Sequence, residues 1–244
     1  MAQAAIPAPV TGRASTATTN SKTPWRWAGG FGLAHIVVML AAFSFEGVAV
    51  EHGTAASRVL HLYGGVAVSR VELGSYVEAM AFLPLIAALV VLTRLLSRTE
   101  TARTAGQVAL GLGVAYAAST FAVGFPPLTA AVYAAHHGVD AGTVATVNDV
   151  RNYGFLLQVA LSMAFTLALG IAALADRRLT TWAGYAGVAV GAIGLVATPF
   201  AHNAMSMVWM IWWVVLSVLC LKGGPKNGSE DSREHGAPEP GRVG

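Results

Sequence analysis

Long runs of apolar residues constrain this chain more than any other feature of its sequence. A helix needs about 20 predominantly apolar residues to cross the roughly 30 Å hydrocarbon core of a bilayer. The chain holds six runs close to that length, at 28–50, 73–96, 106–124, 152–175, 181–198 and 204–221. A stretch at 128–135 can continue the third run beyond Pro126 and Pro127, where a helix ends or kinks. The sequence therefore predicts an all-α, polytopic transmembrane bundle of about six spanning helices.

The scarcity of charged residues supports this fold class and excludes others. Charged residues make up 11% of the 244 residues and hydrophobic residues 55%, whereas a soluble domain carries about 25% charged residues. A water-soluble enzyme is excluded, and we expect the lipid bilayer to be the main partner. The net charge of +3 does not indicate nucleic-acid binding, because the chain has no basic run with interleaved aromatic residues. We therefore expect no nucleic-acid partner.

The placement of lysine and arginine predicts the orientation. Cytoplasmic loops carry an excess of these residues. With a cytoplasmic N-terminus, twelve of the fifteen fall on the inner side, and only Arg58, Arg70 and Arg151 fall outside. We predict a multi-pass plasma-membrane protein with both termini in the cytoplasm. Segments 1–24 and 222–244 lack apolar periodicity and are predicted to be disordered cytoplasmic tails on either side of a membrane domain at 25–221.

A stripe of small residues occupies one face of the fifth run. Gly184, Gly187, Gly191 and Gly194 recur at a spacing of three, four and three residues. Such stripes let helix backbones approach closely inside a membrane, where no hydrophobic effect drives association. The face serves either packing within the chain, which we favour, or the contact of a homo-oligomer.

Glu46 and Glu78 are the most informative single residues, because each lies inside an apolar run. An ionised carboxylate in hydrocarbon costs several kcal/mol, about 3 on insertion scales. Such a side chain therefore faces the protein interior, pairs with a base or carries a proton. Counted at about 1.5 Å per residue, both carboxylates and Gln158 fall at a similar level in the outer half of the bilayer. The catalytic residues stay unknown, with Glu46 and Glu78 as candidates.

Polar residues at helical spacing extend this pair into a predicted ligand pocket. On the fourth run Arg151, Gln158 and Ser162 share one face, and the sixth run carries an equivalent face. Polar groups in hydrocarbon need internal partners, so these faces should point at one another. The ligand-pocket candidates are His35, Arg151, Gln158, Ser162, His202, Asn203, Ser206, Trp209 and Trp213.

Several functions fit this pattern. The carboxylates can pair with Arg151 or Arg70 and merely fix helix register. In the function that we favour, the carboxylates line a ligand pocket. The protein would then be a small membrane module that binds a ligand or is associated with transport or resistance, and its ligand would be a lipophilic small molecule. A membrane-embedded enzyme acting on a lipid-like or isoprenoid substrate, such as a cyclase or isomerase, would use them as general acid and base. A proton-coupled exporter would use them as its proton site.

The sequence predicts no metal site and no cofactor. The histidines near the outer edge lack the spacing of a motif such as H-E-x-x-H, although they could gather with Glu51 and Asp140. His35 lies deeper, lacks an evident histidine partner for haem and is more simply a hydrogen-bonded core residue than a proton relay. Cys220 is the only cysteine, so an intrachain disulfide is excluded. No glycine-rich phosphate loop occurs.

Two segments in the second half carry a family resemblance. Residues 148–152 (NDVRN) precede an apolar helix, and residues 177–187 (RRLTTWAGYAG) form a basic turn with a tryptophan and open a glycine-rich helix. With these features the chain, over about 29–221, resembles a group of uncharacterised bacterial six-helix integral membrane proteins of the domain-of-unknown-function type. The resemblance is mainly topological. It implies the fold and a membrane location, and it brings no substrate or catalytic residues with it.

Overall fold

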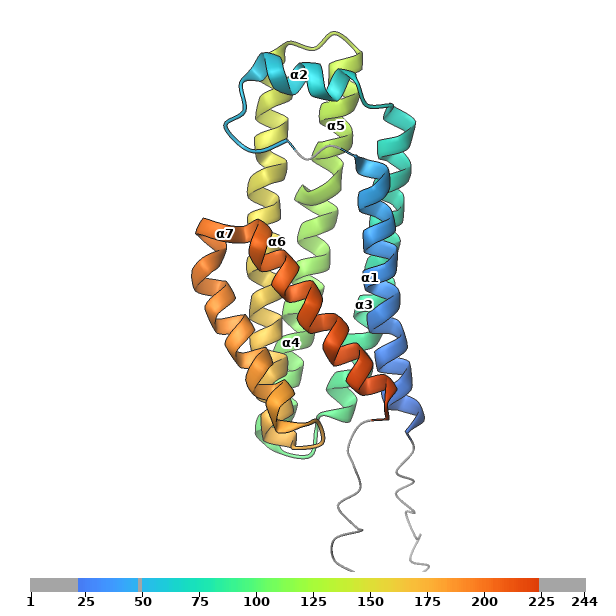
Figure 1. The fold of residues 1–244 in the computed structure, drawn as a ribbon, viewed down its shortest axis with the longest axis vertical. Coiled ribbons are helices and arrows are strands. Elements are labelled where there is room, and N and C mark those ends of the chain that lie inside the picture. Colours follow the sequence, from blue (N-terminus) through green and yellow to red (C-terminus); the bar gives the residue numbers. More distant parts are fainter. Residues whose placement is uncertain (1–21, 48–49, 224–244) are drawn as a thin grey trace, which may run out of the picture.

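The computed structural model describes residues 22–47 and 50–223, and within these residues every regular element is helical. Figure 1 shows an elongated bundle in which most helices run along the long axis. The elements are α1 (Thr23–Glu46), α2 (Ala56–Gly64), α3 (Val68–Leu95), α4 (Glu100–Ser119), the π-helical turn η1 (Thr120–Gly124), α5 (Phe125–His136), α6 (Ala141–Asp176) and α7 (Thr181–Leu221). The predicted all-α class is confirmed.

Five helical segments among the described residues are long and apolar enough to cross a membrane. They are α1, α3, the continuous segment Glu100–His136, α6 and α7. The difference from the six predicted runs lies in α7, which contains both the fifth and the sixth. Ala201 in α7 has φ −146° and ψ 38°, two residues after Pro199, and proline removes a helical hydrogen bond and crowds the preceding turn. Figure 1 shows the result, a hairpin whose first arm lies beside α6 and whose second arm crosses to α1.

Pro126 and Pro127 do not end the third predicted helix. They occupy the first positions of α5, where the missing N–H groups need no partner. The preceding turn η1 absorbs the change of backbone geometry, and the segment continues to His136. The predicted continuation over 128–135 is therefore helical.

The end of the bundle opposite to the described chain ends carries a small second core. We call this core, together with α2 and the parts of α5 and α6 that pack against it, the cap. Figure 1 shows α2 lying across the tops of α5 and α6. Its core contains Val50, Val59, Tyr63, Val71, Leu128, Ala131, Val132 and Val144. Helix α6 begins at Ala141, and Asp140 caps it by accepting a hydrogen bond from the Thr143 amide at 2.9 Å.

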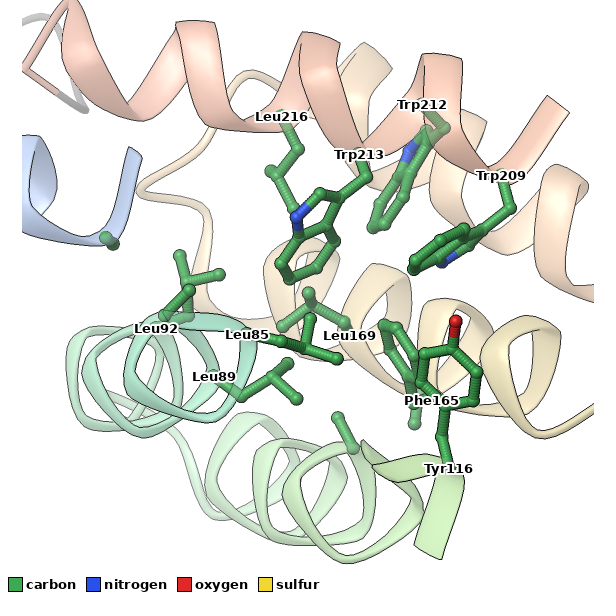
Figure 2. Close-up of a cluster of buried hydrophobic side chains, with 14 of the residues drawn as sticks. Leu85, Leu89, Leu92, Tyr116, Phe165, Leu169, Trp209, Trp212, Trp213 and Leu216 are labelled. Atoms are coloured by element: carbon green, nitrogen blue, oxygen red, sulfur yellow. The ribbon is translucent and has the colours of Figure 1, made fainter. Parts of the chain in front are cut away.

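The main core is aromatic where α7 crosses the bundle. Figure 2 shows Trp209, Trp212 and Trp213 pointing from α7 toward Phe165 of α6 and Tyr116 of α4. Trp213 Nε1 donates a hydrogen bond to the Gly32 carbonyl of α1 at 3.1 Å. The second arm of α7 is thereby fixed both to the centre of the bundle and to its first helix.

The glycine stripe of α7 is used within the chain. Gly184, Gly187, Gly191 and Gly194 are buried, and a Cβ added at any of them would meet Leu174, Gly170, Leu167 or Met163 of α6, respectively. This face is covered by α6, so the interpretation as a homo-oligomer contact does not fit the structure. The small side chains let the two helices approach closely.

The described chain ends lie together. A Cβ added at Gly29 would contact Leu221, and one added at Gly223 would lie 2.9 Å from Lys22 Cδ. Both ends therefore emerge at the end of the bundle opposite to the cap (Figure 1). Of the two predicted tails, residues 1–21 and 224–244 lie outside the described residues, and α1 already begins at Thr23.

Candidate functional site

A cavity of about 670 Å³ lies between α1, α3, α6 and the second arm of α7. It extends from the segment that follows α1, at Val50 and His52, to the aromatic core at Tyr116 and Trp209. Apolar side chains form most of its wall, and polar side chains enter from all four helices. The arrangement is that of a small-molecule site, in which a few placed polar groups interrupt an apolar lining.

Most of the residues predicted from the sequence line this one cavity. They are Glu46, Glu78, Arg151, Gln158, Ser162, His202, Asn203, Ser206 and Trp209. His35 and Trp213 do not line it. The His35 ring is fully buried, and its Nδ1 donates a hydrogen bond to the Ala81 carbonyl at 2.7 Å. Trp213 is bound to the Gly32 carbonyl.

Glu46 and Glu78 are both buried and line the same cavity. The nearest base is Arg151, with Nη2 at 3.7 Å from Glu46 Oε2. Arg70, the other predicted partner, instead donates to the Ser44 carbonyl at 2.8 Å. The close approach of Glu46 to α3 depends on Gly74, where an added Cβ would lie 2.8 Å from Glu46 Cγ.

The charges at this point do not balance. Two carboxyl groups, Glu46 and Glu78, face the single guanidinium of Arg151. A net charge in a poorly hydrated site is costly. The excess negative charge is therefore neutralised by a proton or by a bound cation.

Several buried polar atoms that line the cavity lack a hydrogen-bond partner within the described part of the chain. They are Glu46 Oε1, Gln158 Nε2, His202 Nδ1 and Trp209 Nε1. The two serines differ from them, because Ser162 donates to the Val159 carbonyl at 2.7 Å and Ser206 to the Asn203 carbonyl at 2.8 Å. A buried polar group without a partner costs about 1–3 kcal/mol, so these four atoms call for water or a ligand.

Asn152 contributes to the site in a way that the sequence patterns did not indicate. Its Nδ2 donates to the carbonyls of Val50 and Asn148, each at 3.0 Å. It thereby holds the segment after α1 against α6, where His52 and Tyr153 pack ring to ring with centroids 5.6 Å apart. The signal was weak, because one asparagine on a polar helix face does not identify its distant partner.

The remaining histidines among the described residues do not gather. His136 contacts the Val66 carbonyl at 2.8 Å in the cap, and His137 stacks on Tyr133. No group of three or more His, Cys, Asp or Glu side chains within the described residues is placed to hold a metal ion. Cys220 is buried and carries no disulfide.

Comparison with protein-family models, curated proteins and solved structures finds no match to this chain. The resemblance carried by residues 148–152 and 177–187 therefore stays a prediction. The lengths and the apolar composition of the helices indicate a multi-pass helical membrane protein.

Proposed function

We propose that this chain is a six-span plasma-membrane module whose cavity binds a small amphiphilic molecule. The observation that carries the proposal is the convergence of four unpartnered polar atoms, on Glu46, Gln158, His202 and Trp209, on one apolar-walled cavity. Polar groups in the interior of a membrane bundle need hydrogen-bond partners. Polar groups left open toward a cavity are satisfied by what enters it.

The size of the cavity supports the same function. Small-molecule sites occupy about 300–1,000 Å³, and this cavity of about 670 Å³ lies in the middle of that range. Its lining combines aromatic and methionine side chains with a charged cluster at Glu46, Glu78 and Arg151. A ligand with an apolar body and one polar group fits such a lining.

Ligand binding is tested with two matched variants on α6. Gln158→Leu removes an unpartnered polar atom that lines the cavity. Thr166→Val also removes an unpartnered polar atom, but Thr166 does not line the cavity. The probes are tetraphenylphosphonium, tetraphenylborate and neutral 1-naphthol, added to the full chain in lipid nanodiscs while thermal unfolding is followed. We expect at least one probe to raise the melting temperature of the parent and of Thr166→Val, but not of Gln158→Leu. Binding is ruled out if no probe stabilises the parent, or if both variants respond as the parent does.

The orientation is part of the proposal and has its own test. It is supported by the bias of twelve to three in basic residues and by the position of both described chain ends at one end of the bundle. In a Cys220→Ser background, Ala55→Cys lies before α2 and Thr101→Cys lies in the first turn of α4. A membrane-impermeant maleimide should label Ala55→Cys in intact cells and Thr101→Cys only after permeabilisation. The opposite pattern would invert the proposed topology.

A further inference from the structure

We infer that the ligand of this cavity is a monovalent organic cation with an apolar body, and that its binding displaces one proton carried by Glu78. The inference rests on the proposed function and adds the chemical class of the ligand and its coupling to protons. It follows from three features of the cavity: its charges, its open carboxylate oxygen and its aromatic walls.

The charges that face the site come from every element around it. Among the described residues, Arg151 of α6 is the only arginine or lysine that lines the cavity. The acidic side is larger, because Glu46 and Glu78 are buried and Glu51 lies at the mouth. The other titratable groups that line the cavity are His52, Tyr116, Tyr153 and His202. With neutral histidines the lining has an excess of negative charge, which selects against anions and favours cations.

One carboxylate oxygen is left open for the ligand. Glu46 Oε2 faces Arg151 at 3.7 Å, whereas Glu46 Oε1 is buried and without a hydrogen-bond partner among the described residues. A carboxylate that pairs with a base through one oxygen retains acceptor capacity on the other. Glu46 Oε1 is thus the atom placed to meet a positive group entering the cavity.

The proton follows from charge balance. When the cavity is empty, Arg151 balances the charge of Glu46, and the remaining negative charge, that of Glu78, is neutralised most cheaply by one proton. When a cation enters, it supplies the compensating charge. The carboxyl group then releases its proton to water and becomes the carboxylate that pairs with the ligand. One positive charge enters and one leaves, and no other reactant is needed.

The walls indicate that the cation has an apolar body. Tyr116 and Trp209 meet edge to face with centroids 5.7 Å apart where the cavity reaches the aromatic core. Aromatic faces attract cations, and the flexible side chains of Met207 and Met210 in the lining adapt to irregular shapes. A metal ion would need a compact cage of oxygen ligands, which this large apolar chamber does not provide.

The test compares two probes of the same shape and opposite charge. Tetraphenylphosphonium and tetraphenylborate are titrated into the full chain in nanodiscs by equilibrium dialysis, with empty nanodiscs subtracted. We expect the phosphonium ion to bind and the borate ion not to bind. Glu46→Gln and Glu78→Gln should each weaken phosphonium binding by about tenfold or more. Glu72→Gln, which removes an exposed carboxylate of α3 outside the cavity, should not.

Proton release is measured in the same preparation. Phosphonium binding in a weakly buffered solution with a pH indicator should release about one proton per bound cation in the parent. Acidification should weaken binding, because the proton and the cation compete for the same carboxylates.

Equal affinity for the two probes, binding without proton release, or an equal effect of Glu72→Gln would each overturn the inference. If tetraphenylborate or 1-naphthol stabilises the protein and the phosphonium ion does not, the inference fails while the proposed ligand binding stands.

A measurement on the parent protein covers the case in which the glutamine variants do not fold. Dicyclohexylcarbodiimide reacts with protonated carboxyl groups in apolar surroundings, and peptide mass spectrometry identifies the modified residue. We expect Glu78 to be modified in the empty protein and to be protected by the phosphonium ion but not by the borate ion. Modification that the phosphonium ion leaves unchanged contradicts the inference.

Discussion

Glu46 and Arg151 meet across the cavity without forming a close hydrogen bond, since Arg151 Nη2 lies 3.7 Å from Glu46 Oε2. A charge-assisted hydrogen bond between these groups is about 2.7–2.9 Å long. The Arg151 side chain is 21% exposed and that of Glu46 is 7% exposed, so the pair is partly hydrated on the arginine side. The arginine therefore compensates the buried carboxylates while leaving space between the charges.

Removing Arg151 should cost more stability than removing either carboxylate. Arg151→Gln leaves both Glu46 and Glu78 without a base, and breaking a buried pair costs about 3–5 kcal/mol. We expect the lower end of this range, because Arg151 is partly exposed. Glu46→Gln keeps the volume and removes a charge, so its cost should be smaller. Denaturation in mixed micelles measures both changes.

The double variant gives the control for this comparison. Glu46→Gln combined with Arg151→Gln leaves a single buried carboxyl group, Glu78, which a proton can neutralise. The double variant should be more stable than Arg151→Gln alone. An Arg151→Gln protein as stable as the parent would show that the guanidinium does not compensate the carboxylates.

Gly74→Ala should displace Glu46. The added methyl group would lie 2.8 Å from Glu46 Cγ and 3.1 Å from the Glu46 amide nitrogen, closer than carbon and nitrogen atoms pack. Overpacking of this kind costs about 1–3 kcal/mol, and here it also moves the open carboxylate oxygen. We expect lower thermal stability and weaker phosphonium binding. Gly111→Ala, on a helix face where an added Cβ meets nothing within 4 Å, is the matched control and should leave both unchanged or gain stability.

The cap depends on a buried contact between α2 and α6. The Tyr63 hydroxyl donates a hydrogen bond to Asn148 Oδ1, and both side chains are buried. Tyr63→Phe leaves that oxygen without its donor, which costs about 1–3 kcal/mol. We expect faster hydrogen exchange in 56–64, with exchange near the cavity unchanged. Tyr76→Phe, which alters an exposed tyrosine, is the control. Unaltered exchange in α2 would show that the apolar core alone holds the cap.

The same residue gives the cap a dependence on alkaline pH. Burial raises the pKa of Tyr63 above its ordinary value of 10.0. A group whose pKa is raised on folding contributes stability that is complete below its ordinary pKa and is lost as the pH rises through the folded pKa. We expect α2 to loosen at strongly alkaline pH in the parent and not in Tyr63→Phe. Exchange or proteolysis at 56–64 during an alkaline titration measures this.

Gly191→Ala should destabilise the single chain rather than a contact between chains. Its new methyl group would lie 2.5 Å from the Leu167 amide nitrogen and 2.6 Å from Leu167 Cα. These are backbone atoms that cannot rotate away, so a cost of about 3 kcal/mol is expected. Gly30→Ala, where an added Cβ meets nothing within 4 Å, should be tolerated. Sedimentation at several protein concentrations should show the same oligomeric state for both variants and the parent.

Apolar length and depth were enough to predict much of this molecule. The spans follow from runs that a bilayer demands. The convergence of Glu46, Glu78 and Gln158 follows from counting 1.5 Å per residue from one end of each helix. Gln158 lies near Gly124 of η1. The side chains of Glu46, Glu78 and Gln158 line the same cavity. Counting residues along each helix was enough to place these side chains at one level, because α1, α3 and α6 all run along the long axis of the bundle (Figure 1).

The cap was missed because its helices are not apolar throughout. Helix α2 is nine residues long and buries little beyond Val59 and Tyr63, so it produces no hydropathy signal. Helix α6 begins at Ala141, eleven residues before the predicted 152, because its first turns pack against α2 and α5 instead of lipid. Packing between short amphipathic segments is set by tertiary contacts that hydropathy does not contain.

The site candidates His35 and Trp213 were misplaced for a related reason. Helical spacing gives the face on which a residue lies, but it does not give the neighbour that this face meets. His35 meets the Ala81 carbonyl of α3, and Trp213 meets the Gly32 carbonyl of α1. His35 Nδ1 and Trp213 Nε1 are thus bound to backbone groups of other helices, whereas His35 Nε2 is buried without a hydrogen-bond partner among the described residues.

The contact between Trp213 and Gly32 joins the first helix of the bundle to the last. During synthesis α1 leaves the ribosome before the other described helices, and the second arm of α7 leaves it after them. The contact between them forms only after α7 has been translated. Because α1 and that arm each form a wall of the cavity, a nascent chain that stops before α7 lacks part of the site. Ligand binding would therefore report completed insertion, and a chain arrested before its last helix would be recognisable by its failure to bind.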